Sequence, residues 1–115
     1  DQFKNRNFYK HNPTVTLMRT TVEENEKLGK IIASKLNLAK SETILVIPNG
    51  GFSAIDVKDG PFYCPEADKA LIDSIKKHLT NESVKLIEKE QAINDKAFAE
   101  FSAQQLINLM NEKGK

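Results

Sequence analysis

The residues with the clearest chemical potential lie in one glycine-containing stretch, Pro-Asn-Gly-Gly-Phe-Ser-Ala-Ile-Asp at positions 48–56. It directly follows the apolar run 44–47. A buried strand that ends in a glycine loop can present backbone N–H groups to an anion. The loop continues to about residue 64, which is long for a strand-to-helix connection, and long loops in compact domains are usually functional. The residues expected to contact a small anionic ligand here are Asn49, Gly50, Gly51, Ser53 and Asp56.

A second candidate group, Arg19, Thr20 and Thr21, follows the β-branched and apolar segment 14–19. An arginine can bind phosphate or carboxylate with two parallel hydrogen bonds. The two hydroxyls and the first N–H groups of a following helix would complete an anion site. The alternative has about equal weight: Thr21 and Glu24 have capping-box spacing, and Arg19 forms an ordinary salt bridge.

The glycine stretch also has a purely structural interpretation, in which glycine supplies a positive φ and Phe52 fills the core. It lacks the Gly-Lys-Ser/Thr of a P-loop and the Gly-x-Gly-x-x-Gly pattern. Carboxylates in and after the loop could bind Mg²⁺ together with a ligand's phosphates, although acids near a helix start are more often solvated. These carboxylates are Asp56, Asp59, Glu66 and Asp68. No resident metal site is predicted.

Covalent catalysis is disfavoured. Ser53 lacks the second glycine of a Gly-x-Ser-x-Gly elbow, and a serine nucleophile needs a positioned base. His78 falls late in a predicted helix, so His11 is the only candidate base with a route to the loop. Cys64 is expected to be a small packed residue.

Three strand–helix units position these loops. Strands are predicted at 14–19, 43–47 and 84–88, and helices begin near residues 21, 65 and 96. This alternation predicts an α/β fold, a three-layer Rossmann-like or flavodoxin-like domain with a small, mostly parallel sheet. Ligands gather at the carboxyl ends of such strands, where 19–21, 49–56 and 90–95 would converge. A parallel sheet needs cover on both faces, so a sheet of only three strands is expected to have a missing strand partner or a subunit contact.

Helical periodicity predicts which faces are buried. The first helix carries an apolar stripe formed by Leu28, Ile31, Ile32 and Leu36. The second carries Leu71, Ile75 and Leu79, with Ala67 alongside. The third carries Ala99, Ala103, Leu106, Ile107 and Met110, and Asp95 is its predicted N-cap.

Composition limits the class of protein. The 115 residues include 17 Lys and Arg against 16 Asp and Glu, which argues against a basic nucleic-acid or membrane surface. No apolar run approaches the ~20 residues that span a bilayer. A single cysteine suits a reducing, cytoplasmic setting. Residues 1–13 are interpreted as a connector that packs on the domain or on a missing N-terminal domain, and residues 14–115 as a single α/β domain.

Several ordered motifs resemble one known family. His-Asn-Pro-x-Val-Thr-Leu-Met-Arg-Thr-Thr-x-Glu-Glu-Asn at 11–25, Gly-Pro-Phe at 60–62, Pro-Glu-Ala-Asp at 65–68 and Ile-Asn-Asp at 93–95 are similar to motifs of the Tm-type ATP-binding proteins. These are bacterial and fungal relatives of the tomato mosaic virus resistance protein. Ala92 departs from this pattern, because a histidine often stands there.

The resemblance implies the C-terminal domain of a protein several times longer, which dimerises and binds ATP, with Mg²⁺ as its companion ion. Five of the candidate residues carry over from the family's motifs: Arg19, Thr20, Gly51, Ser53 and Asp56. The leading hypothesis is a nucleotide or phosphorylated-ligand site shared with the missing domain or another subunit. Two alternatives stay open: a dimerisation or assembly module without its own ligand, and half of the active site of an acyl- or phosphoryl-processing enzyme.

Overall fold

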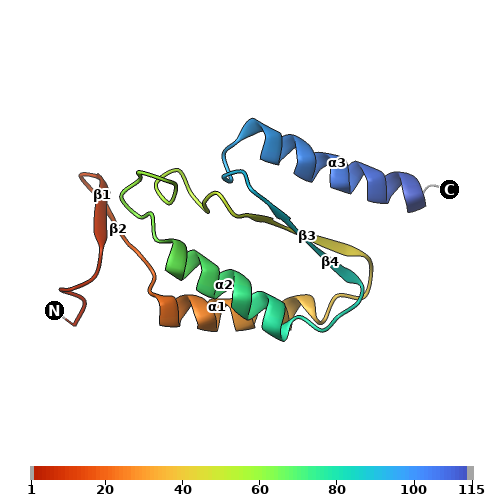
Figure 1. Ribbon diagram of the computed structural model, residues 1–115, viewed down its shortest axis with the longest axis horizontal. Helices are drawn as coiled ribbons and strands as arrows, with labels where there is room; N and C mark the ends of the chain where they lie inside the picture. The colour runs from red at the N-terminus through yellow and green to blue at the C-terminus, as the bar shows by residue number, and fades with distance from the viewer. Residues whose placement is uncertain (1, 114–115) are drawn as a thin grey trace.

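The computed structural model describes residues 2–113, so the predicted outer limits of the connector and the domain, residues 1 and 115, lie outside it. Helices flank a small sheet, with α3 on one side and α1 and α2 on the other (Figure 1). The chain order is β1 (Phe8–Asn12), β2 (Val15–Met18), α1 (Val22–Leu36), β3 (Thr43–Pro48), α2 (Pro65–His78), β4 (Val84–Lys89) and α3 (Lys96–Lys113). The predicted α/β class is confirmed.

The central pair, β3 and β4, is parallel and in register from Thr43 opposite Val84 to Pro48 opposite Lys89. The α2 crossover joins them, as parallel strands require. Ile47 and Val84 are buried in this pair, and Phe98 of α3 is buried as well. The predicted second and third strands are therefore confirmed.

The first predicted strand was placed wrongly in this sheet. β2 instead pairs antiparallel with β1 as a separate two-stranded sheet. The turn between them is stabilised by the side chain of Asn12, which accepts hydrogen bonds from the N–H and hydroxyl of Thr14. A short turn makes local hairpin pairing easy, because little chain entropy is lost in closing it. The parallel sheet of the described chain thus has two strands rather than three.

Helices α1 and α2 pack through small and polar residues. A Cβ added to Gly29 would lie 2.6 Å from both the carbonyl oxygen of Leu71 and Cβ of Ser74. The Asn25 amide donates to the Ala67 carbonyl at 2.7 Å, and the Ser74 hydroxyl donates to the Glu26 carbonyl at 2.6 Å. The two backbones therefore lie unusually close, and glycine is needed at position 29.

Two predicted helix faces differ from the buried ones. In α1 the buried residues are Asn25, Gly29 and Ala33, whereas Leu28 and Ile31 are exposed. In α3 the predicted face is open: Ala99, Ala103, Leu106, Ile107 and Met110 are all exposed. In α2, Ala67 and Ile75 are buried as predicted. Within residues 2–113 the predicted apolar stripe of α3 is thus exposed, whereas in α1 Ile32 and Leu36 are half-buried and the other half of the stripe is exposed.

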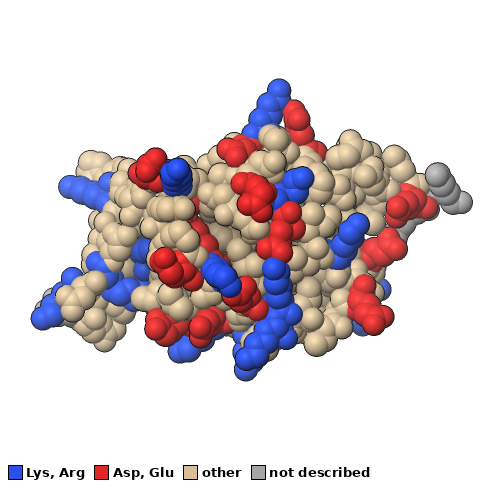
Figure 2. All heavy atoms as spheres, viewed as in Figure 1, with Lys and Arg blue, Asp and Glu red and all other residues tan. Residues whose placement is uncertain are grey.

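The surface carries mixed charge. On the face seen in Figure 2, acidic and basic side chains alternate over the helices and loops. None of the helices within residues 2–113 has the length and hydrophobicity needed to cross a membrane.

Candidate ligand site

The long loop after β3 lies at the carboxyl end of the parallel pair, beside the segment that follows β4. Gly51 forms an isolated parallel bridge with Ala92, the Gly50 N–H donates to the Gln91 carbonyl at 3.0 Å, and the Ile93 N–H donates to the Gly51 carbonyl at 3.0 Å. The two strand-end segments of the predicted site therefore meet, and the glycine loop extends the pairing of β3 with β4.

Gly51 needs to be glycine. Its φ is +143°, and a Cβ there would lie 1.9 Å from the Asp56 carbonyl oxygen. Its N–H donates to the Pro48 carbonyl at 3.1 Å. With the Gly50 N–H also bonded within the chain, both glycine donors expected to cradle an anion are engaged in shaping the loop.

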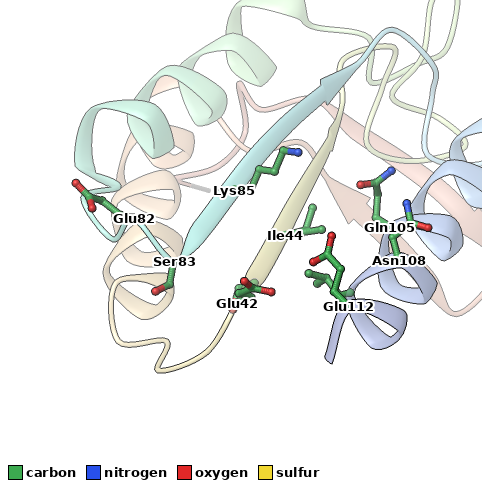
Figure 3. A pocket seen from close by; sticks show the side chains of 10 residues that line it. Glu42, Ile44, Glu82, Ser83, Lys85, Gln105, Asn108 and Glu112 are labelled. Atoms are coloured by element: carbon green, nitrogen blue, oxygen red, sulfur yellow. The ribbon is translucent and has the colours of Figure 1, made fainter. Parts of the chain in front are cut away.

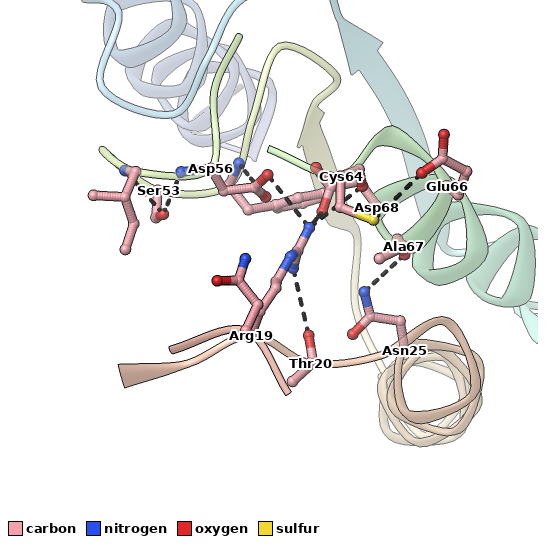
Figure 4. Close-up of polar contacts among 12 residues, drawn as sticks. Arg19, Thr20, Asn25, Ser53, Asp56, Cys64, Glu66, Ala67 and Asp68 are labelled. Atoms are coloured by element: carbon pink, nitrogen blue, oxygen red, sulfur yellow. Dashed lines mark hydrogen bonds and ion pairs between the residues drawn. The ribbon is translucent and has the colours of Figure 1, made fainter. Parts of the chain in front are cut away.

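Arg19 joins three elements at the base of this loop (Figure 4). It follows β2, and its Nη2 donates to Asp68 Oδ1 in the first turn of α2 at 2.6 Å and to Asp56 Oδ1 in the loop at 3.3 Å. The Arg19 and Asp56 side chains are 13% and 4% exposed. The predicted convergence of the segments around Arg19 and Asp56 therefore occurs, although β2 does not belong to the parallel sheet.

The Asp68 carboxyl has a raised pKa in this cluster. Burial raises its pKa to about 6, and the neighbouring Asp56 carboxylate adds to the rise, while Arg19 opposes it. Two carboxylates share a single guanidinium, so one of them is favoured in the protonated form. The cluster can exchange a proton near neutral pH, which is typical of functional sites.

Two side chains at this site, Arg19 and Ser53, have hydrogen-bond donors that are not fully used. The buried Nε of Arg19 has no hydrogen-bond partner among the described residues, and Nη1 makes only a 3.4 Å contact with the Thr20 hydroxyl oxygen. The hydroxyl oxygen of Ser53 accepts the N–H groups of Ile55 and Asp56, which leaves its own proton free to donate. A buried donor without a partner needs an explanation, such as strain, a functional role, or a bound water or ion.

The remaining predicted residues have local roles. Thr21 caps α1 in a complete capping box with Glu24, as its spacing predicted. The exposed Asn49 donates its amide to Glu88 at 3.1 Å. Of the four carboxylates considered for Mg²⁺, Asp56 and Asp68 come together, while Asp59 and Glu66 are exposed. The described residues contain no group of three side chains able to hold a metal ion.

Residues suggested for nucleophilic chemistry are not connected. His11 and Ser53 line one apolar hollow of about 340 Å³, together with Phe62, but the hydrogen bonds of residues 2–113 include none between them. His78 contacts the Ser74 carbonyl oxygen near the far end of α2. The Cys64 thiol donates to the exposed Glu66 carboxylate at 3.4 Å.

A separate hollow of about 510 Å³ lies at the amino ends of β3 and β4, under the last turns of α3 (Figure 3). Glu42, Glu82 and Glu112 line it, with Lys85 as a basic neighbour. Ligands of open α/β sheets bind at the opposite, carboxyl end of the strands. The Arg19 cluster is therefore the stronger candidate site.

From the sequence, Asp68 was considered only as a possible Mg²⁺ ligand and not as the partner of Arg19. Arg19 and Asp68 are 49 residues apart in the chain, so their pairing could not be inferred from local spacing. The available signal was positional: Asp68 lies in the first turn of the helix that follows the long loop.

These features define an α/β domain with a buried arginine–carboxylate cluster at its strand ends. The sequence model of the C-terminal domain of UPF0261, an uncharacterised protein family, matches residues 1–110. The chain belongs to this family.

Curated relatives are much longer than this chain. A UPF0261 protein of Clostridium tetani is 50% identical over 112 residues, which cover 97% of this chain and 28% of that protein. A UPF0261 protein of Rhizobium meliloti is 41% identical over 101 residues, which cover 87% of this chain and 25% of that protein. The ToMV resistance protein Tm-1(GCR237) of Solanum lycopersicum is 41% identical over 101 residues, which cover 85% of this chain and 13% of that protein. The chain thus spans about a quarter or less of each, and ATP binding stays a prediction.

Proposed function

We propose that this domain contributes the Arg19 cluster and the loop around Ser53 to a site for a phosphorylated small ligand, with a nucleotide as the leading candidate. The remainder of the site would come from the N-terminal part of the full-length protein. The observation that carries the proposal is the buried, unpartnered Nε of Arg19. A phosphate oxygen can accept a charge-assisted hydrogen bond from this free Nε–H.

The net charge of the Arg19 cluster favours a phosphate group that binds together with a cation. Asp56 and Asp68 together outweigh the single positive charge of Arg19, so a bare anion is repelled unless Asp68 is protonated. Mg²⁺ usually binds through substrate phosphates and one or two carboxylates, and keeps several waters. The domain by itself offers too few ligands for a resident metal, so the proposed ligand is Mg-ATP or a related Mg-nucleotide.

Calorimetric titration of the full-length protein tests this proposal. Mg-ATP should bind, whereas inorganic phosphate should bind at least ~10-fold more weakly because it lacks the cation and the base. Arg19→Lys keeps one positive charge beside the carboxylates but removes Nε, and should weaken Mg-ATP binding by ~10-fold or more. Lys96→Arg is the control exchange, since Lys96 pairs with Glu100 in α3 and not with the cluster.

Thermal melting of each variant separates a lost contact from a lost fold. Equal Mg-ATP affinity in the wild type and a folded Arg19→Lys variant would remove Arg19 from the site. No binding by the wild-type protein would reject the proposal and leave the assembly module as the better hypothesis. Turnover of ATP would instead favour the enzyme half-site.

A further inference from the structure

The outer edge of β3 is unpaired within residues 2–113, where β4 is its only strand neighbour. The N–H of Thr43 donates to the Ser83 carbonyl at the start of the pair, and the N–H of Asn49 donates to the Lys89 carbonyl just past its end. Because backbone groups alternate along a strand, the N–H groups of Ile44 and Val46 point to the opposite edge. Pro48, which has no N–H, ends that edge.

An apolar groove runs along this edge. It has a volume of about 390 Å³ and lies between β3 and α3. Ile44 and Val46 line its strand side, and Phe98, Leu106 and Leu109 line its helix side. Figure 3 shows the Ile44 side chain on the side of β3 that faces α3. The groove has the position that the side chains of a neighbouring strand would occupy.

Apolar side chains are exposed on both layers that flank the sheet. On α3, Leu106, Ile107 and Met110 are 60%, 47% and 64% exposed. On α1, across the sheet from α3 in Figure 1, Leu28 and Ile31 are 42% and 49% exposed. Helices that cover a parallel sheet normally bury such stripes against it. Both layers therefore expose apolar surface that no strand within residues 2–113 covers.

The outer edge of β4 has the opposite character. Three of the six residues of β4 are charged, Lys85, Glu88 and Lys89, and Glu88 forms a 2.6 Å ion pair with Lys76 of α2. Charged residues on an edge strand are a common protection against further pairing. The core of β3, Ile44 to Ile47, carries no charge at all. An added strand is therefore expected at β3 and not at β4.

We infer that the outer edge of β3 receives a further strand from the same polypeptide, contributed by the part of the full-length protein that precedes this domain. The family match is to a C-terminal domain, and the Clostridium tetani relative has only 28% of its length in the matched region. A segment of the same chain is present at high effective concentration, which favours it over a separate partner. This inference does not depend on a nucleotide site.

Hydrogen–deuterium exchange of the wild-type full-length protein, resolved to single amides by fragmentation, tests the pairing. The amides of Ile44 and Val46 should exchange ~100-fold or more slowly than in an unstructured peptide, as the inner amides of Leu45 and Ile47 should. Rapid exchange at Ile44 and Val46, with slow exchange at Leu45 and Ile47, would show a free edge and overturn the inference.

Photo-crosslinking identifies the occupant. A benzophenone amino acid replacing Leu106 should crosslink to a segment upstream of this domain and leave the monomer mass unchanged on a denaturing gel. The same replacement at Leu38, which is 76% exposed and lies outside the groove, is the matched control. A product of doubled mass would assign the groove to a second copy, and crosslinks only within the domain would leave it unfilled; either result overturns the inference.

Discussion

Asp68 should make the protein less stable as the pH rises from about 4 to about 6. Its pKa is raised from 3.8 to about 6 in the folded protein, chiefly by burial. In this window the folded protein holds a proton that the unfolded chain releases, so the free energy of unfolding falls as pH rises. A difference of about 2 pKa units at ~1.4 kcal/mol each gives a loss of about 3 kcal/mol.

Urea unfolding of the full-length protein at several values between about pH 4 and pH 7 measures this loss. The comparison is with Asp68→Asn, which cannot ionise and should lack the decline, so the two curves should diverge by about 2–3 kcal/mol toward neutral pH. Asp73→Asn is the matched control on the same helix, because the Asp73 side chain is 53% exposed. Its curve should follow the wild type.

Two results would refute this account of Asp68. A constant difference between wild type and Asp68→Asn at every pH would mean that Asp68 has the same pKa in both states. A wild type that gains stability over Asp68→Asn as pH rises would mean that the attraction of Arg19 outweighs burial.

Two further substitutions test the packing and capping of α1. Gly29→Ala should lower the free energy of unfolding by about 1–3 kcal/mol through overpacking against Leu71 and Ser74, although alanine is the better helix former by ~1 kcal/mol. A variant that is more stable than the wild type in urea unfolding would contradict the close contact. Thr21→Ala should lower the unfolding free energy by about 1 kcal/mol through loss of the N-cap, and Thr20→Ala, one residue outside the capping box, should cost less; equal losses would argue against the cap.

Elements with strong local signals could be predicted from the sequence. The apolar run at 44–47 predicted β3, and the Thr21 and Glu24 spacing predicted the start of α1. The pairing of β2 could not be predicted in this way. Its residues suit either a buried parallel strand or a hairpin, and the choice depends on the turn at Asn12, whose side-chain hydrogen bonds stabilise the local alternative.

Side-chain partners across the chain were harder to predict than elements. The segments around Arg19 and Asp56 were expected to meet, whereas a ligand anion and an ordinary salt bridge had about equal weight for Arg19. The structure shows Arg19 paired with two carboxylates. In α3 the apolar stripe was predicted to be buried and is exposed, because periodicity shows that a face is apolar without showing what covers it. No described residue of this chain covers the apolar stripe of α3.

The close contact between α1 and α2 has a consequence for motion. Gly29 brings the two backbones together, and the Asn25 and Ser74 hydrogen bonds connect them, so we expect the helix pair to move together as one frame. Asp68 belongs to that frame, whereas Asp56 lies in the loop. If the arginine is to exchange a carboxylate for a ligand, Asp56 is the partner that moves away, and the loop rather than the helices acts as the hinge.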